Sequence, residues 1–246
     1  MKSFGQGFNA VVVGASGGLG RAFVEALLGD PALGGLLACS RSDPGFGDPR
    51  AAWQRLDLED EATIAEAAKA AEARLGPLHL VIVASGLLHD GAGLQPEKTW
   101  RALEAEALER AYKVNAVGPA LLAKHVLPCL DRGRKSAFAV LTARVGSISD
   151  NRLGGWYAYR ASKAAANMLV RTLSIELARR NPAALCVALH PGTVDTALSR
   201  PFQRGVPDGK LFSPAGSAGH LLEVLDRLGP DDSGQFFAWD GQRIHF

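Results

Sequence analysis

The sequence predicts one α/β domain of the doubly wound kind, with a seven-stranded, mainly parallel sheet and helices on both of its faces. Short aliphatic runs alternate with longer stretches of helical period along all 246 residues, which is the pattern that a parallel sheet with crossover helices requires. A glycine-rich turn from Gly14 to Gly20 stands where the first aliphatic run passes into the first helical stretch. A single α/β domain commonly has this length, so we expect residues 1–246 to fold together.

The strands are predicted from short aliphatic runs that end at turn residues. The first is Phe8 to Val13, and the helix after it, from about Gly20 to Leu28, stops at Gly29, Asp30 and Pro31. The other predicted strands are Leu36 to Cys39, Trp53 to Leu56, Leu78 to Val83, Ala137 to Leu141, Leu185 to Leu189 and Gln235 to Trp239.

The remaining helices are predicted from apolar residues that recur three or four positions apart. Residues 195–213 show little periodicity and contain two prolines and two glycines, so we expect a mobile loop beside the substrate. The predicted helices are Ile64 to Leu75, Leu103 to Leu130 with interruptions near Gly118 and Pro128, Trp156 to Arg180, and Ser217 to Leu228.

Composition excludes several classes of protein. A formal charge of +2 is too small to indicate a nucleic-acid partner. The longest mostly apolar run, Leu78 to Leu88, is well below the roughly twenty residues that span a bilayer, so we expect no membrane segment. Cys39, Cys129 and Cys186 cannot all pair and lack metal-ligand spacing, which favours a cytoplasmic protein without a metal site.

The glycine-rich turn predicts a site for a dinucleotide. Gly14, Gly18 and Gly20 have the spacing G-x-x-x-G-x-G, a variant of the dinucleotide-binding fingerprint of the Rossmann fold. Glycine at the start of a helix lets the backbone approach a pyrophosphate closely. We therefore expect Gly14, Ser16, Gly18, Leu19 and Gly20 to contact the cofactor; a purely structural tight turn is the alternative.

The end of the second predicted strand favours NADP(H) over NAD(H). An acidic residue there would hold the ribose 2'-hydroxyl, whereas a basic residue accommodates a 2'-phosphate. This chain has Ser40 and Arg41, and a guanidinium binds phosphate in a fork geometry. Asp43 keeps NAD open, and Arg41 as a solvated surface residue is the alternative.

Two further strand ends are expected to contact the nucleoside. Asp57, followed by Leu58, could accept a hydrogen bond from the adenine amino group, although an acidic residue before a helix is also a common cap. Gly86, after Ala84 and Ser85, would provide a flat floor, or simply a strand-ending turn.

Tyr159 and Lys163 are the predicted catalytic pair. Residues four apart share one face of a helix, so the phenol and the ammonium would lie side by side. A neighbouring positive charge is expected to lower the pKa of the phenol, and the same lysine retains donors for a ribose hydroxyl. Tyr157 lacks the helical spacing to Lys163.

These motifs together resemble the short-chain dehydrogenase/reductase family over nearly the whole chain. Within the family, the segment Tyr157 to Lys163 and the ending Gly234 to Phe237 are similar to the branch with the C-factor signalling proteins and the sniffer-type carbonyl reductases. The matching pieces are Gly14 to Gly20, Asp57, Ala84 to Gly86, Asn115, Tyr159 to Lys163, and Pro191 to Thr196.

The resemblance implies roles for residues outside the two main motifs. Asn115 would support a water near Lys163, the alternative being a polar residue that bends its helix. Val194 would bond the nicotinamide carboxamide through its backbone, and Thr196 would touch carboxamide or phosphate. Pro191 and Gly192 would lie beside the cofactor, or form only a strand-ending turn. The family also implies a homodimer or homotetramer.

Two departures from the family pattern affect the expected chemistry. The family's Ser-Ser pair, whose second serine orients the substrate oxygen, is Thr142-Ala143 here. Ser147 is our first candidate for the missing donor and Thr142 the second. A double asparagine common at the strand end before Gly86 is replaced by Ala84 and Ser85, which leaves fewer polar contacts for the cofactor.

The predicted function is NADP-dependent reduction of a small-molecule carbonyl, or oxidation of the corresponding alcohol. Tyr159 would be the general acid/base, Lys163 would tune it and hold ribose, Ser147 would orient the substrate, and Asn115 would hold the water. Ala143 keeps a second interpretation open, in which the protein is a non-catalytic regulator that binds the dinucleotide in the same pocket.

Overall fold

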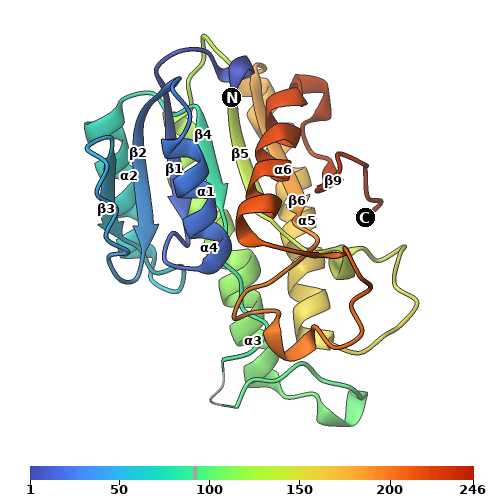
Figure 1. Ribbon diagram of the computed structural model, residues 1–246. Helices are drawn as coiled ribbons and strands as arrows, with labels where there is room; N and C mark the ends of the chain where they lie inside the picture. The colour runs from blue at the N-terminus through green and yellow to red at the C-terminus, as the bar shows by residue number, and fades with distance from the viewer. Residues whose placement is uncertain (91–92) are drawn as a thin grey trace.

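Seven strands form one sheet in which every neighbouring pair runs parallel (Figure 1). The computed structural model describes residues 1–90 and 93–246. The strands of this sheet are β1 (Phe8–Val13), β2 (Leu33–Ser40), β3 (Ala51–Arg55), β4 (Leu80–Val83), β5 (Ser136–Leu141), β6 (Ala184–His190) and β9 (Phe236–Ala238). Their order is β3-β2-β1-β4-β5-β6-β9, so the predicted doubly wound fold is confirmed, with a sheet that is wholly rather than mainly parallel.

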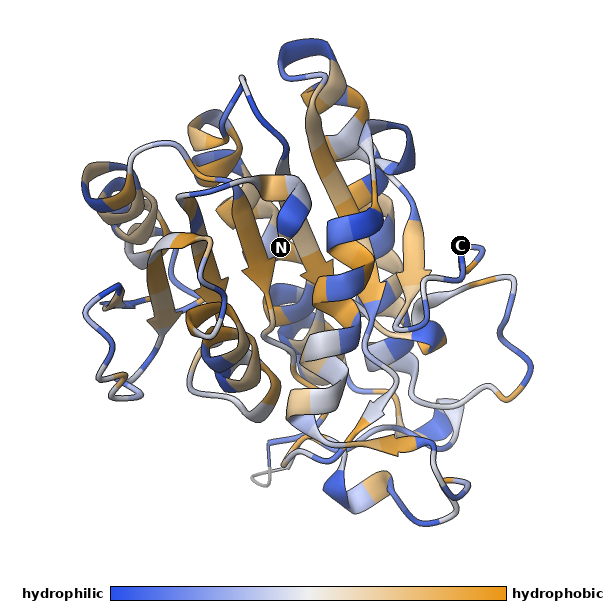
Figure 2. Cartoon of the chain, turned by 45° about the horizontal axis from the view of Figure 1, so that its top comes forward, coloured by the Kyte–Doolittle hydropathy of each residue, from blue (hydrophilic) through white to orange (hydrophobic). Residues whose placement is uncertain are grey.

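Helices cover both faces of the sheet, as predicted. One face carries α1 (Gly18–Leu28) and α6 (Pro214–Arg227); the other carries α2 (Glu61–Leu75), α4 (Gly118–Val126) and α5 (Tyr157–Arg180) (Figure 1). The helices carry both hydrophilic and hydrophobic residues, while the strands between them are strongly hydrophobic (Figure 2). Short 3-10 turns occur at Lys2–Phe4, Trp100–Ala102, Leu127–Cys129, Arg144–Gly146, Arg200–Phe202 and Pro230–Asp232.

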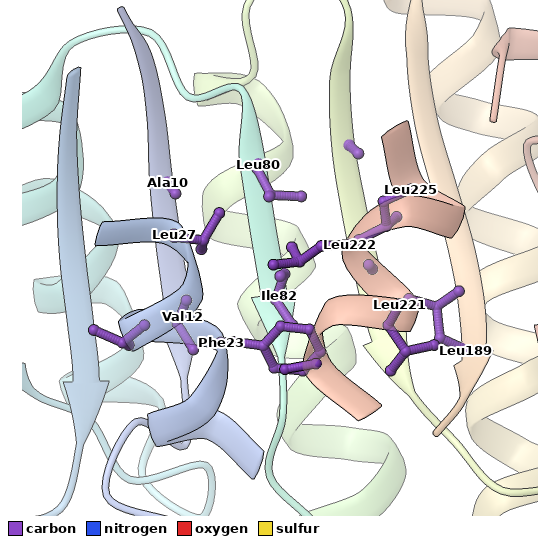
Figure 3. Packing of buried hydrophobic residues seen from close by; sticks show 14 of the residues in the cluster. Ala10, Val12, Phe23, Leu27, Leu80, Ile82, Leu189, Leu221, Leu222 and Leu225 are labelled. Carbon is purple, nitrogen blue, oxygen red and sulfur yellow. The ribbon is translucent and has the colours of Figure 1, made fainter. Parts of the chain in front are cut away.

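The strands are buried on both sides, which explains why their sequences are aliphatic throughout rather than alternating. In β1, Ala10 and Val12 belong to the cluster with α1 and α6, whereas Val11 and Val13 belong to the cluster with α2 and α4. Figure 3 shows the first cluster, where Phe23 of α1 and the leucines of α6 lie over the same face of the sheet. Full burial of one such side chain contributes about 1.5–3 kcal/mol.

The long helix expected over Leu103 to Leu130 is divided in the structure. It consists of α3 (Ala105–Tyr112), a π-helical turn (Lys113–Val117), α4 and a 3-10 turn. Gly118 permits close packing of α4 on the turn after β3, because a Cβ there would lie 2.6 Å from the Cβ of Leu58. The π-helical turn places Asn115 at the junction, and such turns often occur at functional sites.

The segment 195–213 is more regular than the sequence predicts. Strands β7 (Thr193–Val194) and β8 (Leu211–Phe212) pair in parallel at its base, and a 3-10 turn at Arg200–Phe202 lies between them. Strands of two residues are too short to show a period in sequence, so periodicity could not reveal them. The segment is therefore a loop closed at its base by a small sheet.

None of the helices in the described ranges is long and apolar enough to cross a membrane. In a parallel sheet the carboxyl ends of all strands lie at one edge. From β1 the chain adds β2 and β3 on one side, and then returns to add β4 and the later strands on the other side of β1, so the order of the strands switches between β1 and β4. A crevice for a ligand is expected at that switch point.

Candidate active site

A cavity of about 790 Å³ follows the carboxyl ends of the central strands. This volume lies in the range typical of small-molecule and cofactor sites. The predicted residues that line it are Gly14, Ser16, Gly18, Leu19, Ser40, Arg41, Asp57, Leu58, Ala84, Ser85, Gly86, Tyr159, Lys163, Pro191, Gly192, Val194 and Thr196. Three predicted residues, Gly20, Asn115 and Ser147, are not part of the cavity wall.

The glycine-rich turn has the shape that a dinucleotide requires. Gly14 has φ +90°, and a Cβ there would lie 2.6 Å from Oγ of Ser85. A Cβ on Gly20 would overlap the carbonyl oxygen of Gly14, so Gly20 serves the packing of α1 on the turn. Thr196 lies over the start of α1, with its Cγ2 3.0 Å from the Cβ that Gly18 lacks. These residues fit a pyrophosphate at the helix N-terminus.

The part of the cavity wall that follows β2 presents a basic side chain. Arg41 is exposed, lines the cavity and makes no ion pair or hydrogen bond within the described ranges. Asp43 is not in the cavity wall; its carboxylate accepts from the N–H of Gly45 at 2.8 Å. Ser40 lies in the wall but donates its hydroxyl to the carbonyl of Ser42 at 2.7 Å. Among the residues that the structure describes, Arg41 therefore has an unpartnered guanidinium at this end of the cavity.

Asp57 lines the cavity and is not the cap of α2. That cap is Asp60, which accepts from the N–H of Ala62 at 3.0 Å. One carboxylate oxygen of Asp57 accepts from the N–H of Glu59 at 3.0 Å. Asp57 thus stabilises the turn before α2 and also lines the cavity, so the interpretation as a helix cap is wrong, and the contact with adenine stays a prediction.

Tyr159 and Lys163 lie in the first two turns of α5 and are almost fully buried in the cavity wall. The ammonium of Lys163 donates to the carbonyl of Leu141 at 2.9 Å and lies 5.7 Å from the centroid of the Tyr159 ring. A Cβ on Gly86 would lie 3.5 Å from Nζ of Lys163, so glycine keeps the space beside the ammonium open. The helix therefore places the pair together, as the spacing predicts.

The pKa of the phenol moves against the expected direction. Burial raises the pKa of Tyr159 to about 12 and lowers the pKa of Lys163 to about 8. The exposed fractions are 9% and 3%, and the ammonium bonds to Leu141 instead of the phenol, so loss of hydration outweighs the attraction between the two groups. The prediction of a lowered phenol pKa is therefore wrong for this state. At neutral pH Tyr159 is a protonated acid.

Asn115 is buried behind the cavity wall. Its amide exchanges two hydrogen bonds of 2.8 Å with the backbone of Leu87 and donates to Oγ of Ser162 at 3.0 Å. A Cβ on Gly86 would lie 3.6 Å from Oδ1 of Asn115. Asn115 therefore joins the π-helical turn to the strand end after β4 and to the catalytic helix.

The structure does not bring Ser147 to the cavity. Its hydroxyl donates to the carbonyl of His245 and accepts from the N–H of Asp150 at 3.1 Å. Ser147 is 1% exposed, and these two backbone groups engage its oxygen. The loop after β5 instead folds against the segment before Phe246, a contact between residues 98 apart that local sequence cannot indicate. Ser147, our first candidate for the donor to the substrate oxygen, therefore lies outside the cavity wall.

Thr142, the second candidate, lies in the cavity wall. It is 3% exposed, and its buried hydroxyl has no hydrogen-bond partner among residues 1–90 and 93–246. A buried hydroxyl without a partner costs free energy, so its retention needs an explanation. The explanation would be that this hydroxyl donates a hydrogen bond to an oxygen of a bound ligand.

Sequence reasoning missed His190, which lies at the carboxyl end of β6 in the cavity wall. Burial lowers its pKa to about 4, with Arg144 adding to the effect, so the imidazole is neutral at physiological pH. Its Nδ1 is buried and unpartnered within the described chain. A histidine before Pro-Gly at a strand end gave no spacing signal that pointed to this environment.

Aromatic rings form the part of the cavity wall next to Tyr159. Trp156 packs edge-on against Tyr159 at 6.2 Å and against Phe202 at 5.0 Å, and Phe202 contacts His89 at 5.6 Å between ring centroids. Trp156 and Phe202 line the cavity, whereas Phe212 packs on Trp239. No group of three or more His, Cys, Asp or Glu side chains in the described chain is arranged to hold a metal ion.

Two known proteins match part of this chain in sequence. The C-signal of Myxococcus xanthus is 40% identical over 137 residues, covering 56% of this chain and 77% of that protein. The 1-hydroxy-2-glutathionyl-2-methyl-3-butene dehydrogenase of Rhodococcus sp. (strain AD45) is 36% identical over 140 residues, covering 57% of this chain and 59% of that protein.

Solved structures and a family model extend the match. NADPH-bound carbonyl reductase from chicken fatty liver superposes with a TM-score of 0.85 at 29% identity, over 98% of this chain and 100% of that chain. Carbonyl reductase Sniffer of D. melanogaster has the same fold, with a TM-score of 0.82 at 24% identity over 98% and 100% of the two chains. The family model for short chain dehydrogenase matches residues 9–206. The chain therefore belongs to the short chain dehydrogenase family of oxidoreductases.

Proposed function

We propose that the protein reduces a small-molecule carbonyl with NADPH, or oxidises the corresponding alcohol with NADP. The observation that carries this proposal is the phenol of Tyr159, which is buried in the cavity wall beside Lys163. A neutral phenol is suited to donate a proton to an oxygen that gains negative charge. When bound, the reduced nicotinamide supplies the hydride that the carbonyl carbon accepts.

Tyr159 and Lys163 divide the proton chemistry between them. Tyr159 donates its hydroxyl proton to the substrate oxygen, and the nearby ammonium of Lys163 stabilises the phenolate that remains. Lys163 uses one donor on the carbonyl of Leu141, so it retains donors for a ribose hydroxyl. The proton returns to Tyr159 through a water that the π-helical turn at Asn115 supports, beside Gly86.

Thr142 orients the substrate oxygen in this proposal, in place of Ser147. Its hydroxyl lines the cavity and has no partner in the described residues, so it can donate without breaking an existing bond. A donor aimed at a developing oxyanion is worth about a hundredfold or more in rate.

The preference for NADP(H) rests on Arg41. Its guanidinium lines the ribose end of the cavity without a partner in the described chain, and the carboxylate of Asp43 is engaged in its own turn. An aspartate facing the ribose is the feature that would favour NAD. The NADPH bound to the chicken carbonyl reductase is consistent with this preference.

The substrate is proposed to be an apolar carbonyl compound. Beyond Tyr159 the wall is formed by Trp156 and Phe202 together with Val145, Leu198 and Val206. These side chains offer apolar surface and ring faces near the phenol, and they would bury a hydrophobic group attached to the carbonyl.

The test is a steady-state assay of the purified protein with NADPH and a panel of aldehydes, ketones and quinones. Oxidation of NADPH that depends on both the carbonyl and Tyr159 supports the proposal. The rival is a regulator that binds the dinucleotide without turnover, which Ala143 and the likeness to C-signal favour. Tight NADPH binding with no turnover of any carbonyl would support the regulator instead.

A further inference from the structure

The catalytic helix begins in an unusual way. Its N-cap residue is Trp156, whose backbone is left-handed with φ 53° and ψ 45°. Within the described ranges Trp156 is the only non-glycine residue with positive φ. A left-handed bulky residue is strained, and an indole has no acceptor for the free N–H groups of the first turn. Something else must hold this helix start.

Glu97 provides what Trp156 lacks. Both oxygens of its carboxylate accept from the N–H of Ala158, at 3.3 and 3.2 Å, and its backbone carbonyl accepts from the N–H of Trp156 at 2.5 Å. Ala158 is the second residue of α5, the position whose N–H an N-cap side chain ordinarily satisfies. The cap therefore comes from a loop 61 residues earlier in the chain.

The environment of Glu97 indicates that its carboxylate serves to cap α5. The residue is 5% exposed, and no cation pairs with it in the described part of the chain. Burial of a carboxyl group without a partner is costly, and the positive end of a helix dipole compensates that cost. Loss of the cap would leave both the strained Trp156 and the first turn unsupported.

The same contacts fix the two rings that face the substrate. Tyr159 directly follows Ala158, and the indole of Trp156 lies 6.2 Å from the phenol ring and 5.0 Å from the ring of Phe202. The guanidinium of Arg160 also donates to the carbonyls of Gly154 and Gly155, which stabilises the segment before Trp156. A shift of the helix start would therefore move the acid and the substrate wall together.

We propose that Glu97 is a positioning residue for the reaction: its buried carboxylate caps the catalytic helix and holds Trp156 left-handed, which sets the phenol of Tyr159 against the substrate. This inference rests on the proposed function. Glu97 does not line the cavity, so it acts through Trp156 and Ala158 without contact with substrate or cofactor.

The test compares Glu97→Ala and Glu97→Gln with Asp131→Ala. Asp131 is a matched control, because its carboxylate also accepts from backbone N–H groups, those of Gly133 and Arg134 at 2.7 Å, in the turn before the amino end of β5. Glu97→Ala should lower kcat by about tenfold or more, since small misplacements of reacting groups are costly. The Kd for NADPH should change by less than about threefold, and Glu97→Gln, which retains an acceptor of equal reach, should recover most of kcat.

A readout independent of turnover is the near-ultraviolet circular dichroism of Trp156, identified by difference with Trp156→Phe. This signal should change in Glu97→Ala, persist in Glu97→Gln and persist in Asp131→Ala. If Glu97→Ala does not fold, Glu97→Asp replaces it: the carboxylate is one methylene short, so kcat should fall below that of Glu97→Gln.

Two results would overturn the inference. One is a kcat in Glu97→Ala, or in Glu97→Asp, equal to wild type; the other is a loss of kcat in Asp131→Ala that matches the loss in Glu97→Ala, which would assign the effect to general stability. Failure of the proposed function is separate, because wild-type protein would then turn over no carbonyl while the dichroism difference could still be measured.

Discussion

The two hydroxyls after β5 should respond in opposite ways to removal. Thr142→Val keeps the shape of a buried, β-branched side chain and deletes a hydroxyl that has no partner in the described chain. Removing an unsatisfied buried hydroxyl should raise the free energy of unfolding by about 1–3 kcal/mol. If Thr142 donates to the substrate oxygen, kcat should fall about a hundredfold, equivalent to about 2.7 kcal/mol of transition-state stabilisation.

Ser147→Ala is the matched comparison. Ser147 is equally buried, but its hydroxyl joins the carbonyl of His245 to the N–H of Asp150, and deletion leaves both backbone groups without that bond. The free energy of unfolding should fall by about 1–2 kcal/mol, while kcat should stay within about threefold of wild type.

Urea denaturation of both variants gives the stability changes, and initial rates of carbonyl-dependent NADPH oxidation give kcat. We expect Thr142→Val to be more stable and slow, and Ser147→Ala to be less stable and active. This expectation is refuted if Ser147→Ala loses kcat while Thr142→Val retains it, because the donor would then be the serine that the structure places outside the cavity.

Three further changes test other parts of the site. Arg41→Ala should raise the Kd for NADPH about tenfold or more and leave the Kd for NADH nearly unchanged, as fluorescence titration can measure; equal effects would contradict a 2'-phosphate site. Between pH 8 and 10 the unfolded chain still binds the Lys163 proton that the folded protein releases, because burial lowers the folded pKa to about 8 from 10.5. The free energy of unfolding should therefore gain about 2–3 kcal/mol from this group as pH rises, and Lys163→Met should remove that part of the slope. Gly146→Ala would place a Cβ 2.8 Å from the backbone carbon and the Cβ of Lys163. The free energy of unfolding, measured by thermal unfolding, should fall by about 1–3 kcal/mol, and kcat should fall as well. Unchanged values would show that the loop moves to accommodate the methyl group.

The features that the sequence predicted are those that follow from local pattern and strand direction. Tyr159 and Lys163 share a helix face because they are four residues apart, and Gly14 and Ser85 meet because parallel strands end at one edge of the sheet. These relations need only secondary structure and topology.

The features that the sequence could not predict depend on contacts between distant segments. Ser147 is engaged by His245, 98 residues later, and α5 is capped by Glu97, 61 residues before the N–H that it binds. The pKa of Tyr159 was predicted in the wrong direction because spacing reveals a neighbouring charge but not the depth of burial, and burial dominates here.

The most direct test of the central claim compares Tyr159→Phe with Tyr157→Phe, two single-oxygen deletions in the first turn of the same helix. We expect Tyr159→Phe to bind NADPH as wild type does but to lose carbonyl-dependent hydride transfer by about a thousandfold, whereas Tyr157→Phe should remain within about threefold of wild type. Equal turnover of Tyr159→Phe and wild type would contradict the claim that this phenol is the acid.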